Sequence, residues 1–278
     1  MKLKIKTPVG NYYYKYIPIY LGIKPINKVI AKENLLLLKS ILDNNNVLFL
    51  LSFGTLLGAV REHDFISHDE DIDLILFKKD LPKFLSLLFV LRENGFEIVR
   101  YESRGFLSIM RKGEYIDIYF FDDYPEDCSL SYCCRDMYSK KLLEDTAEIE
   151  FQGAMFQAPR DYEQYLEFNY GSNWKTPIPY VSFKMSKIQK AKVLCLQYAK
   201  MLLPEAITEK LQKKSRQTLH RQMGKKAKNS NSKAKATMTL LFKNNIKIIR
   251  ICKQSFWLPG WANGSANTQK TTQNVCCL

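Results

Sequence analysis

Four acidic residues stand within five positions, in the segment Asp69-Glu70-Asp71-Ile72-Asp73. Asp71 and Asp73 are two positions apart at the start of an apolar run, and alternate residues of a strand project from the same face. Asp117 stands between two isoleucines, so the same alternation directs its side chain away from them. Converging carboxylates suit Mg²⁺ or Mn²⁺. We predict that Asp71, Asp73 and Asp117 are metal ligands, and a solvated acidic turn is the alternative interpretation.

A glycine and a threonine, Gly54 and Thr55, follow the apolar segment 47–51. A glycine after a strand allows backbone N–H groups to approach a phosphate, and the N-terminus of a following helix favours negative charge. Turns of this kind are also common in purely structural roles. The short distance in sequence to the acidic segment is what favours a phosphate site here.

The apolar patterns predict elements that would bring these residues together. The expected helices span 31–44, 55–62, 81–94 and 161–170, and the expected strands span 47–51, 72–77, 96–101, 106–111 and 115–121. Strands that alternate with helices and then follow one another predict an α+β (α/β-like) domain, with a mixed sheet flanked by helices.

Three regions are expected along the chain. They are an irregular lead-in at 1–28, a catalytic domain at 29–182 and a basic C-terminal extension at 183–278. Helical periodicity in the extension covers 183–222 and 238–252, and the lysine-rich segment 224–236 is expected to be flexible. The end of the extension is expected to be poorly ordered.

The net charge of +14 comes from 42 basic and 28 acidic residues. Residues 184–278 hold 20 of the basic residues and only two acids, Glu205 and Glu209, which leaves 22 basic and 26 acidic residues in 1–183. The body therefore carries about −4 and the extension about +18, and a uniformly basic nucleic-acid binder is disfavoured. The extension is open to three interpretations: a solvated linker, a nucleic-acid contact, or a segment attracted to anionic lipid, which we favour.

Two patterns point to a cytoplasmic protein. No apolar stretch reaches the roughly 18–20 residues that a bilayer-spanning helix needs, and Pro8, Gly10, Lys15 and Pro18 interrupt the N-terminal segment where a secretory signal would need an apolar core. The seven cysteines form no CxxC pair, which argues against a disulfide scaffold or a zinc ribbon.

Three blocks of sequence resemble the LicD family of the nucleotidyltransferase superfamily. They are Gly54-Thr55-Leu56-Leu57-Gly58-Ala59-Val60-Arg61, the segment 65–73 that ends on the acidic residues, and 165–177, with the sequence Tyr-Leu-Glu-Phe-Asn-Tyr-Gly-Ser-Asn-Trp-Lys-Thr-Pro. The resemblance covers roughly residues 30–180. The departures are mild: Glu70 stands where an aspartate is usual, and Ser67-His68 where Pro-Trp or Pro-His is frequent.

The resemblance implies a transferase that moves a phospho-alcohol, such as phosphocholine, from a CDP-linked donor to a sugar hydroxyl, with CMP leaving. The implied acceptor is a cell-surface glycan, a lipopolysaccharide or a lipid-linked glycan, and the implied cofactor is Mg²⁺ or Mn²⁺. Asp71 and Asp73 would hold the metal ion, and Asp117 would be a third ligand or the general base toward the acceptor hydroxyl. Gly54 and Thr55 would contact the donor phosphate, and Arg61 would pair with it through two N–H groups.

Three further residues are weaker candidates for substrate binding. His68 stands beside the acids and would support them or contact the acceptor, but a turn histidine without a chemical role is equally compatible with the sequence. Tyr170 and Trp174 would stack on a base or a sugar ring, although the end of a helix packed over the sheet is the interpretation that we favour.

Two rival functions stay open. A nucleotidyltransferase that moves a nucleoside monophosphate onto a small molecule or an RNA end would use the same acids, but it would release pyrophosphate and not CMP. A non-catalytic membrane or nucleic-acid adaptor on a degenerate scaffold would need none of these acids, and their presence argues against it. An LicD-like phosphotransferase at the inner face of the cell membrane is therefore the leading prediction.

Overall fold

The computed structural model describes residues 2–19, 24–102, 104–134, 136–177 and 186–202, together with isolated positions between 207 and 220. The predicted flexible segment 224–236, the helix predicted at 238–252 and the predicted disordered end fall outside these residues. Among the described helices none is both long enough and apolar enough to cross a membrane.

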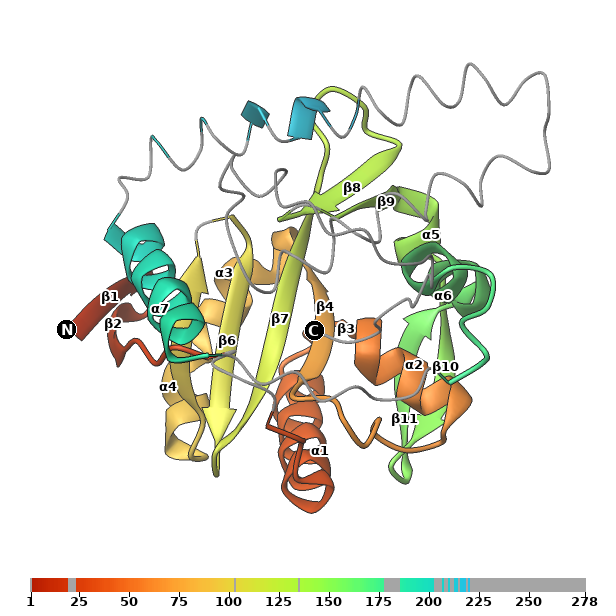
Figure 1. The fold of residues 1–278 in the computed structure, drawn as a ribbon, viewed down its shortest axis with the longest axis horizontal. Helices are drawn as coiled ribbons and strands as arrows, with labels where there is room; N and C mark the ends of the chain where they lie inside the picture. The colour runs from red at the N-terminus through yellow and green to blue at the C-terminus, as the bar shows by residue number, and fades with distance from the viewer. Residues whose placement is uncertain are drawn as a thin grey trace.

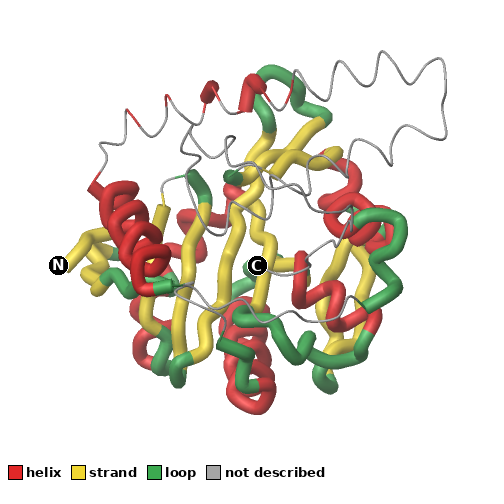
Figure 2. Tube along the Cα trace, in the orientation of Figure 1, coloured by secondary structure: helices red, strands yellow, loops and turns green. Residues whose placement is uncertain are grey.

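A mixed sheet of nine strands forms the centre of the molecule (Figures 1 and 2). Its main path has the order β10-β11-β3-β4-β7-β6-β5, and β8 and β9 extend it from β7. The bounds are β3 Phe49–Leu51, β4 Ile72–Phe77, β5 Glu97–Glu102, β6 Phe106–Arg111, β7 Glu114–Asp123, β8 Leu130–Cys133, β9 Asp136–Ser139, β10 Thr146–Phe151 and β11 Ala154–Pro159. This confirms the predicted α+β class with a mixed sheet.

The two central strands, β4 and β7, run parallel, and β3 and β6 flank them in antiparallel pairs. Every residue of β4 is buried, as expected for a strand covered on both faces. Asp73 of β4 stands directly opposite Asp117 of β7, and Ser108 of β6 stands opposite Asp117 on its other side. Residues that are paired in register project from the same face, so one face of the sheet carries these polar side chains.

Helices complete the layers around the sheet. They are α1 Lys28–Asn44, α2 Phe53–Arg61, η1 Lys78–Asp80, α3 Leu81–Ser86, α4 Leu88–Glu93, α5 Lys140–Glu144, α6 Tyr162–Tyr170 and α7 Lys187–Leu202. The side chain of Asn27 caps α1 by accepting from the N–H groups of Val29 and Ile30. The predicted helix at 81–94 is divided into α3 and α4, which meet at Leu87.

The expectation of an irregular lead-in at 1–28 is wrong. Strands β1, Lys2–Thr7, and β2, Gly10–Lys15, form an antiparallel hairpin. Its alternation of apolar and polar residues buries Ile5, Tyr12 and Tyr14. The lysines and prolines of this segment obscured the alternation of buried and exposed residues along its two strands.

Residues 130–159 also form strands and a short helix that the sequence pattern did not predict. Strands β10 and β11 form a hairpin across the turn residues Gln152 and Gly153, which both have positive φ. The single residue pair Gln157–Leu50 joins this hairpin to β3 in parallel. The helix expected at 161–170 is confirmed as α6, and α7 lies within the helical periodicity of 183–222.

Candidate active site

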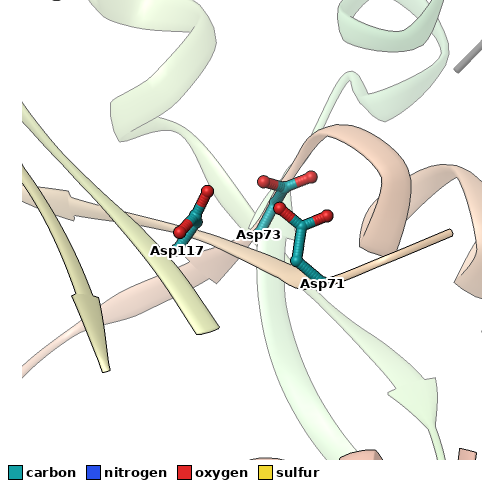
Figure 3. A group of neighbouring side chains, drawn as sticks. All are labelled: Asp71, Asp73 and Asp117. Atoms are coloured by element: carbon teal, nitrogen blue, oxygen red, sulfur yellow. The ribbon is translucent and has the colours of Figure 1, made fainter. Parts of the chain in front are cut away.

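Three carboxylates meet on the sheet face that Asp73 and Asp117 share (Figure 3). One oxygen each from Asp71, Asp73 and Asp117 lies within 4.8 Å of the other two. All three residues are buried, with at most 1% of their surface exposed. This burial excludes a solvated acidic turn. Three adjacent carboxylates withdrawn from water repel one another unless cations or hydrogen-bond donors compensate their charge.

Asp73 is held from two sides by the start of α2. Its backbone N–H donates to the hydroxyl oxygen of Thr55 at 2.8 Å, and the N–H of Gly54 donates to its carboxylate Oδ2 at 3.3 Å. Thr55 is itself buried. In the structure both residues therefore position Asp73, while their predicted contact with a donor phosphate stays a prediction.

The chain enters α2 through a left-handed residue. Phe53 has a φ of +42°, which is uncommon for a residue with a side chain and marks local strain. Its ring packs against those of Tyr119 and Tyr165, at 5.0 Å and 6.1 Å between centroids. This aromatic packing holds the turn that directs the Gly54 N–H toward Asp73.

Both glycines of α2 face the loop between α2 and β4 at close range. A Cβ atom on Gly54 would lie 2.2 Å from Oδ2 of Asp69, and one on Gly58 would lie 2.5 Å from the carbonyl oxygen of Asp64. At Gly58 the neighbour is backbone, so only glycine allows the approach, whereas at Gly54 a larger residue would displace the side chain of Asp69. The Gly-x-x-x-Gly spacing of α2 therefore fixes the loop that leads into Asp71.

Asp117 has a partner at each carboxylate oxygen. The hydroxyl of Ser108 donates to Oδ1 at 2.6 Å, and Nη2 of Arg100 lies 3.7 Å from Oδ2. Sequence reasoning missed both residues. Ser108 is a polar residue within the apolar start of β6, which is a usable signal, whereas Arg100 lies in a strand with two other charged residues and gives none. Only the strand register shows that both reach Asp117.

Arg61 and His68 form a second group, at the C-terminal end of α2. Nη1 of Arg61 donates to the backbone oxygen of Trp174 at 3.3 Å, and Nη2 donates to Glu62 at 2.6 Å. Burial lowers the pKa of His68, while the nearby charges of Glu62 and Arg61 act in opposite directions on it. These contacts place Arg61 in a structural cluster, and its predicted pairing with a phosphate stays a prediction.

The aromatic residues near the end of α6 differ in their surroundings. Trp174 is buried in the main core, and Nζ of Lys175 lies 5.2 Å from the centre of its ring system. Tyr170 is half-buried and packs against the same core. These positions agree with the favoured interpretation, a helix end packed on the domain.

Glu70, which stands where the resembled pattern usually has an aspartate, directly precedes Asp71 and is buried. The hydroxyl of Tyr115 donates to its Oε2 at 3.4 Å. Glu70 therefore contacts Tyr115, which stands two positions before Asp117 on β7.

The chain is similar in sequence to two ribitol-phosphate transferases. A ribitol-5-phosphate transferase, FKTN, from Mus musculus is 30% identical over 168 residues, covering 56% of this chain and 35% of that protein. The ribitol 5-phosphate transferase FKRP from Mus musculus is 26% identical over 143 residues, covering 47% of this chain and 29% of that protein. The chain thus spans about a third of the length of these relatives.

Among solved structures, the lincomycin-bound lincosamide antibiotic adenylyltransferase LnuA matches 56% of this chain and 91% of its own, with 12% identity and a TM-score of 0.38.

Residues 46–161 match the sequence profile of the LicD/FKTN/FKRP nucleotidyltransferase domain. The match contains all three carboxylates together with Gly54 and Thr55, whereas the block 165–177 lies beyond it. Over residues 46–161, which include the candidate active site, this chain is therefore similar to the LicD family.

Proposed function

We propose that this chain transfers a phospho-alcohol from a CDP-linked donor to a sugar hydroxyl and releases CMP. The observation that carries the proposal is the buried group Asp71, Asp73 and Asp117, which lies within the region that is similar to the LicD family. The similar FKTN and FKRP proteins are ribitol 5-phosphate transferases, which supports a phospho-alcohol as the transferred group. A cell-surface glycan, a lipopolysaccharide or a lipid-linked glycan is the proposed acceptor.

The three carboxylates fit a divalent cation with hard oxygen ligands. One oxygen from each lies within 4.8 Å of the other two, and carboxylate oxygens are the ligands that Mg²⁺ and Mn²⁺ prefer. Asp71 and Asp73 would hold the ion, with Asp117 as the third ligand. When bound, Mg²⁺ or Mn²⁺ would neutralise charge on the phosphate oxygens of the donor.

The protein residues around these acids would orient the reaction. Thr55 and Gly54 fix Asp73 through the two hydrogen bonds at the start of α2. Ser108 fixes the carboxylate plane of Asp117. In the general-base alternative, Asp117 would accept the proton of the acceptor hydroxyl, and the oxygen would then attack the donor phosphate while CMP departs.

The decisive experiment is to incubate the chain with Mg²⁺ and a panel of CDP-linked alcohols, ribitol and choline among them, and to measure CMP release with and without a glycan acceptor. We expect acceptor-dependent CMP release that chelation of the metal abolishes. Asp73→Asn should lower turnover by roughly 10²–10³-fold or more, since it removes charge from the centre of the site.

Asp122→Asn is the matched control, because Asp122 is also an aspartate of the central sheet, on the same strand as Asp117, but it pairs with Lys78 at 3.0 Å. It should retain the turnover of the original chain. Pyrophosphate release from a nucleoside triphosphate, without CMP release from any CDP-linked donor, would show a nucleotidyltransferase instead.

We also propose that the basic C-terminal extension brings the enzyme to an anionic membrane surface. Its excess of basic residues supports this, as does the exposure of Lys187, Lys190 and Lys192 on α7 beside the apolar Ile188, which is 69% exposed. Each basic residue placed near an anionic lipid surface contributes about 1 kcal/mol.

A further inference from the structure

Arg100 of β5 lies beside the candidate active site, and it comes from outside the blocks that resemble the family. Its Nη2 atom lies 3.7 Å from Oδ2 of Asp117. Its side chain is only 11% exposed. Arg61, the arginine predicted to meet the donor phosphate, donates instead to Glu62 and to the backbone of Trp174.

The guanidinium group of Arg100 is held in place by its neighbours on the same sheet face. Its central carbon lies 4.0 Å from the centre of the Phe106 ring, which is a cation–π contact. Its Nε atom lies 3.8 Å from Oε1 of Glu102, and Glu102 also pairs with Arg104. The group is therefore positioned before any substrate arrives, which lowers the entropic cost of binding an anion.

A fixed cation beside a metal ligand has an electrostatic cost. A divalent ion held by Asp117 would be repelled by the guanidinium group that pairs with the same carboxylate, so a purely structural arginine would weaken the metal site. An anionic donor removes the conflict, because its phosphate oxygens attract both cations. A planar guanidinium group also matches the paired oxygens of a phosphate better than a lysine does.

We propose that Arg100 binds the phosphate of the donor next to Asp117. The inference rests on the proposed function for the identity of the donor, and it adds a specificity residue that the sequence motifs do not indicate. Arg100 acts on the phosphate through charge and hydrogen bonds, and Phe106 and Glu102 position it.

The test measures binding of two probes, inorganic pyrophosphate and CDP, each with Mg²⁺, by calorimetry. We expect Arg100→Gln to bind both probes roughly 10- to 100-fold more weakly, the range for hydrogen bonds to a charged group. Arg100→Lys keeps the charge but loses the planar guanidinium group. Its affinity for each probe should therefore lie between those of the original chain and Arg100→Gln. Binding of Mn²⁺ alone, followed by electron paramagnetic resonance, should stay unchanged or become tighter in Arg100→Gln.

Arg92→Gln is the matched control. Arg92 also has its guanidinium carbon over a ring, 3.9 Å from the centre of Tyr12, and it also pairs with a glutamate, Glu97. Its removal should leave the affinity for both probes unchanged. Thermal unfolding of Arg92→Gln and Arg100→Gln, followed by circular dichroism, shows whether the two variants are folded.

Two results would overturn the proposal. Arg100→Gln could bind pyrophosphate as tightly as the original chain, or it could lose Mn²⁺ and pyrophosphate in the same proportion, which is what a structural counter-ion of Asp117 would do. Pyrophosphate binding that depends on Arg100, without CMP release from any CDP-linked donor, would refute the proposed function and leave this inference standing. CMP release, together with pyrophosphate binding that Arg100→Gln leaves unchanged, would support the proposed function and refute this inference.

Discussion

The two glycines of α2 make different contacts, and this difference is testable residue by residue. A Cβ atom on Gly58 would meet backbone, 2.5 Å from the oxygen of Asp64. A Cβ atom on Gly54 would meet the end of a side chain, Oδ2 of Asp69, at 2.2 Å. Backbone cannot move aside as easily as a carboxylate, so Gly58→Ala should destabilise the fold by about 1–3 kcal/mol and Gly54→Ala by less.

Urea unfolding of the two variants, followed by circular dichroism, measures this order. Gly54→Ala should in turn affect activity more than stability, since it displaces Asp69 beside the N–H group that donates to Asp73. An equal loss of stability in both variants, or a larger loss in Gly54→Ala, would contradict the contact geometry.

How far the sequence could predict the site is clearest in the residues around Asp117. Alternation along a strand is a local property, so it sufficed to predict that Asp71, Asp73 and Asp117 project away from the apolar positions beside them. Ser108 and Arg100 depend on which strands are neighbours and in what register, and neither is encoded locally. The sequence therefore indicated the acids but not the residues that hold them.

At the scale of elements, Asp64 ties the loop between α2 and β4 to two distant parts of the fold. Its Oδ2 accepts from Nζ of Lys28 at 2.7 Å, and its Oδ1 accepts from the side-chain amide of Gln152 at 2.8 Å and from the N–H of Phe65 at 2.8 Å. Burial acts to raise the pKa of Asp64, but these hydrogen bonds outweigh it, so its pKa is lowered.

A lowered pKa gives Asp64 a defined effect on acid stability. The folded state binds its proton more weakly than the unfolded state, so this contribution is present above the unfolded pKa of about 4 and is lost as the pH falls through the lower folded value. Asp64→Asn should therefore be less stable than the original chain at pH 7, with the gap closing in acid. The gap should be under about 1 kcal/mol, since solvent screens a side chain that is 43% exposed.

Urea unfolding midpoints of both proteins between pH 3 and pH 7 provide the measurement. A gap that stays constant across this range would mean that Asp64 acts through packing or neutral hydrogen bonds alone.

Element prediction succeeded where one period dominated and failed where composition concealed it. The fully apolar run at 72–77 was predicted with the bounds that β4 has, because burial on both faces leaves no polar interruption beyond Asp73. The hairpin of β1 and β2 was missed because lysines occupy its solvent face and tyrosines much of its buried face. The β10–β11 hairpin was missed for a related reason, since three of the six residues of β10 are polar.

At the scale of the whole molecule, some described residues of the basic extension contact the body. Nη1 of Arg216 donates to the hydroxyl of Tyr132 at 2.8 Å, and Nε2 of His220 lies 3.8 Å from Asp127. These contacts join the extension to the region of β7 and β8. The lysines of α7 lie elsewhere, on a helix beside the β1–β2 hairpin, where Tyr16 donates to Gln197 at 2.9 Å (Figure 1).

If the extension brings the enzyme to an anionic membrane, α7 should contribute in a way that depends on salt. The full chain should sediment with vesicles that contain phosphatidylserine at low salt and much less at high salt, because screening shortens the reach of exposed charges. Changing Lys187, Lys190 and Lys192 to glutamate should reduce the bound fraction, since three attractions of about 1 kcal/mol each become repulsions.

The matched control changes three exposed lysines of the body, Lys32, Lys79 and Lys141, and should sediment as the original chain does. Equal sedimentation of both triple variants would assign the attraction to net charge and not to α7, and a chain indifferent to lipid and salt would refute membrane association.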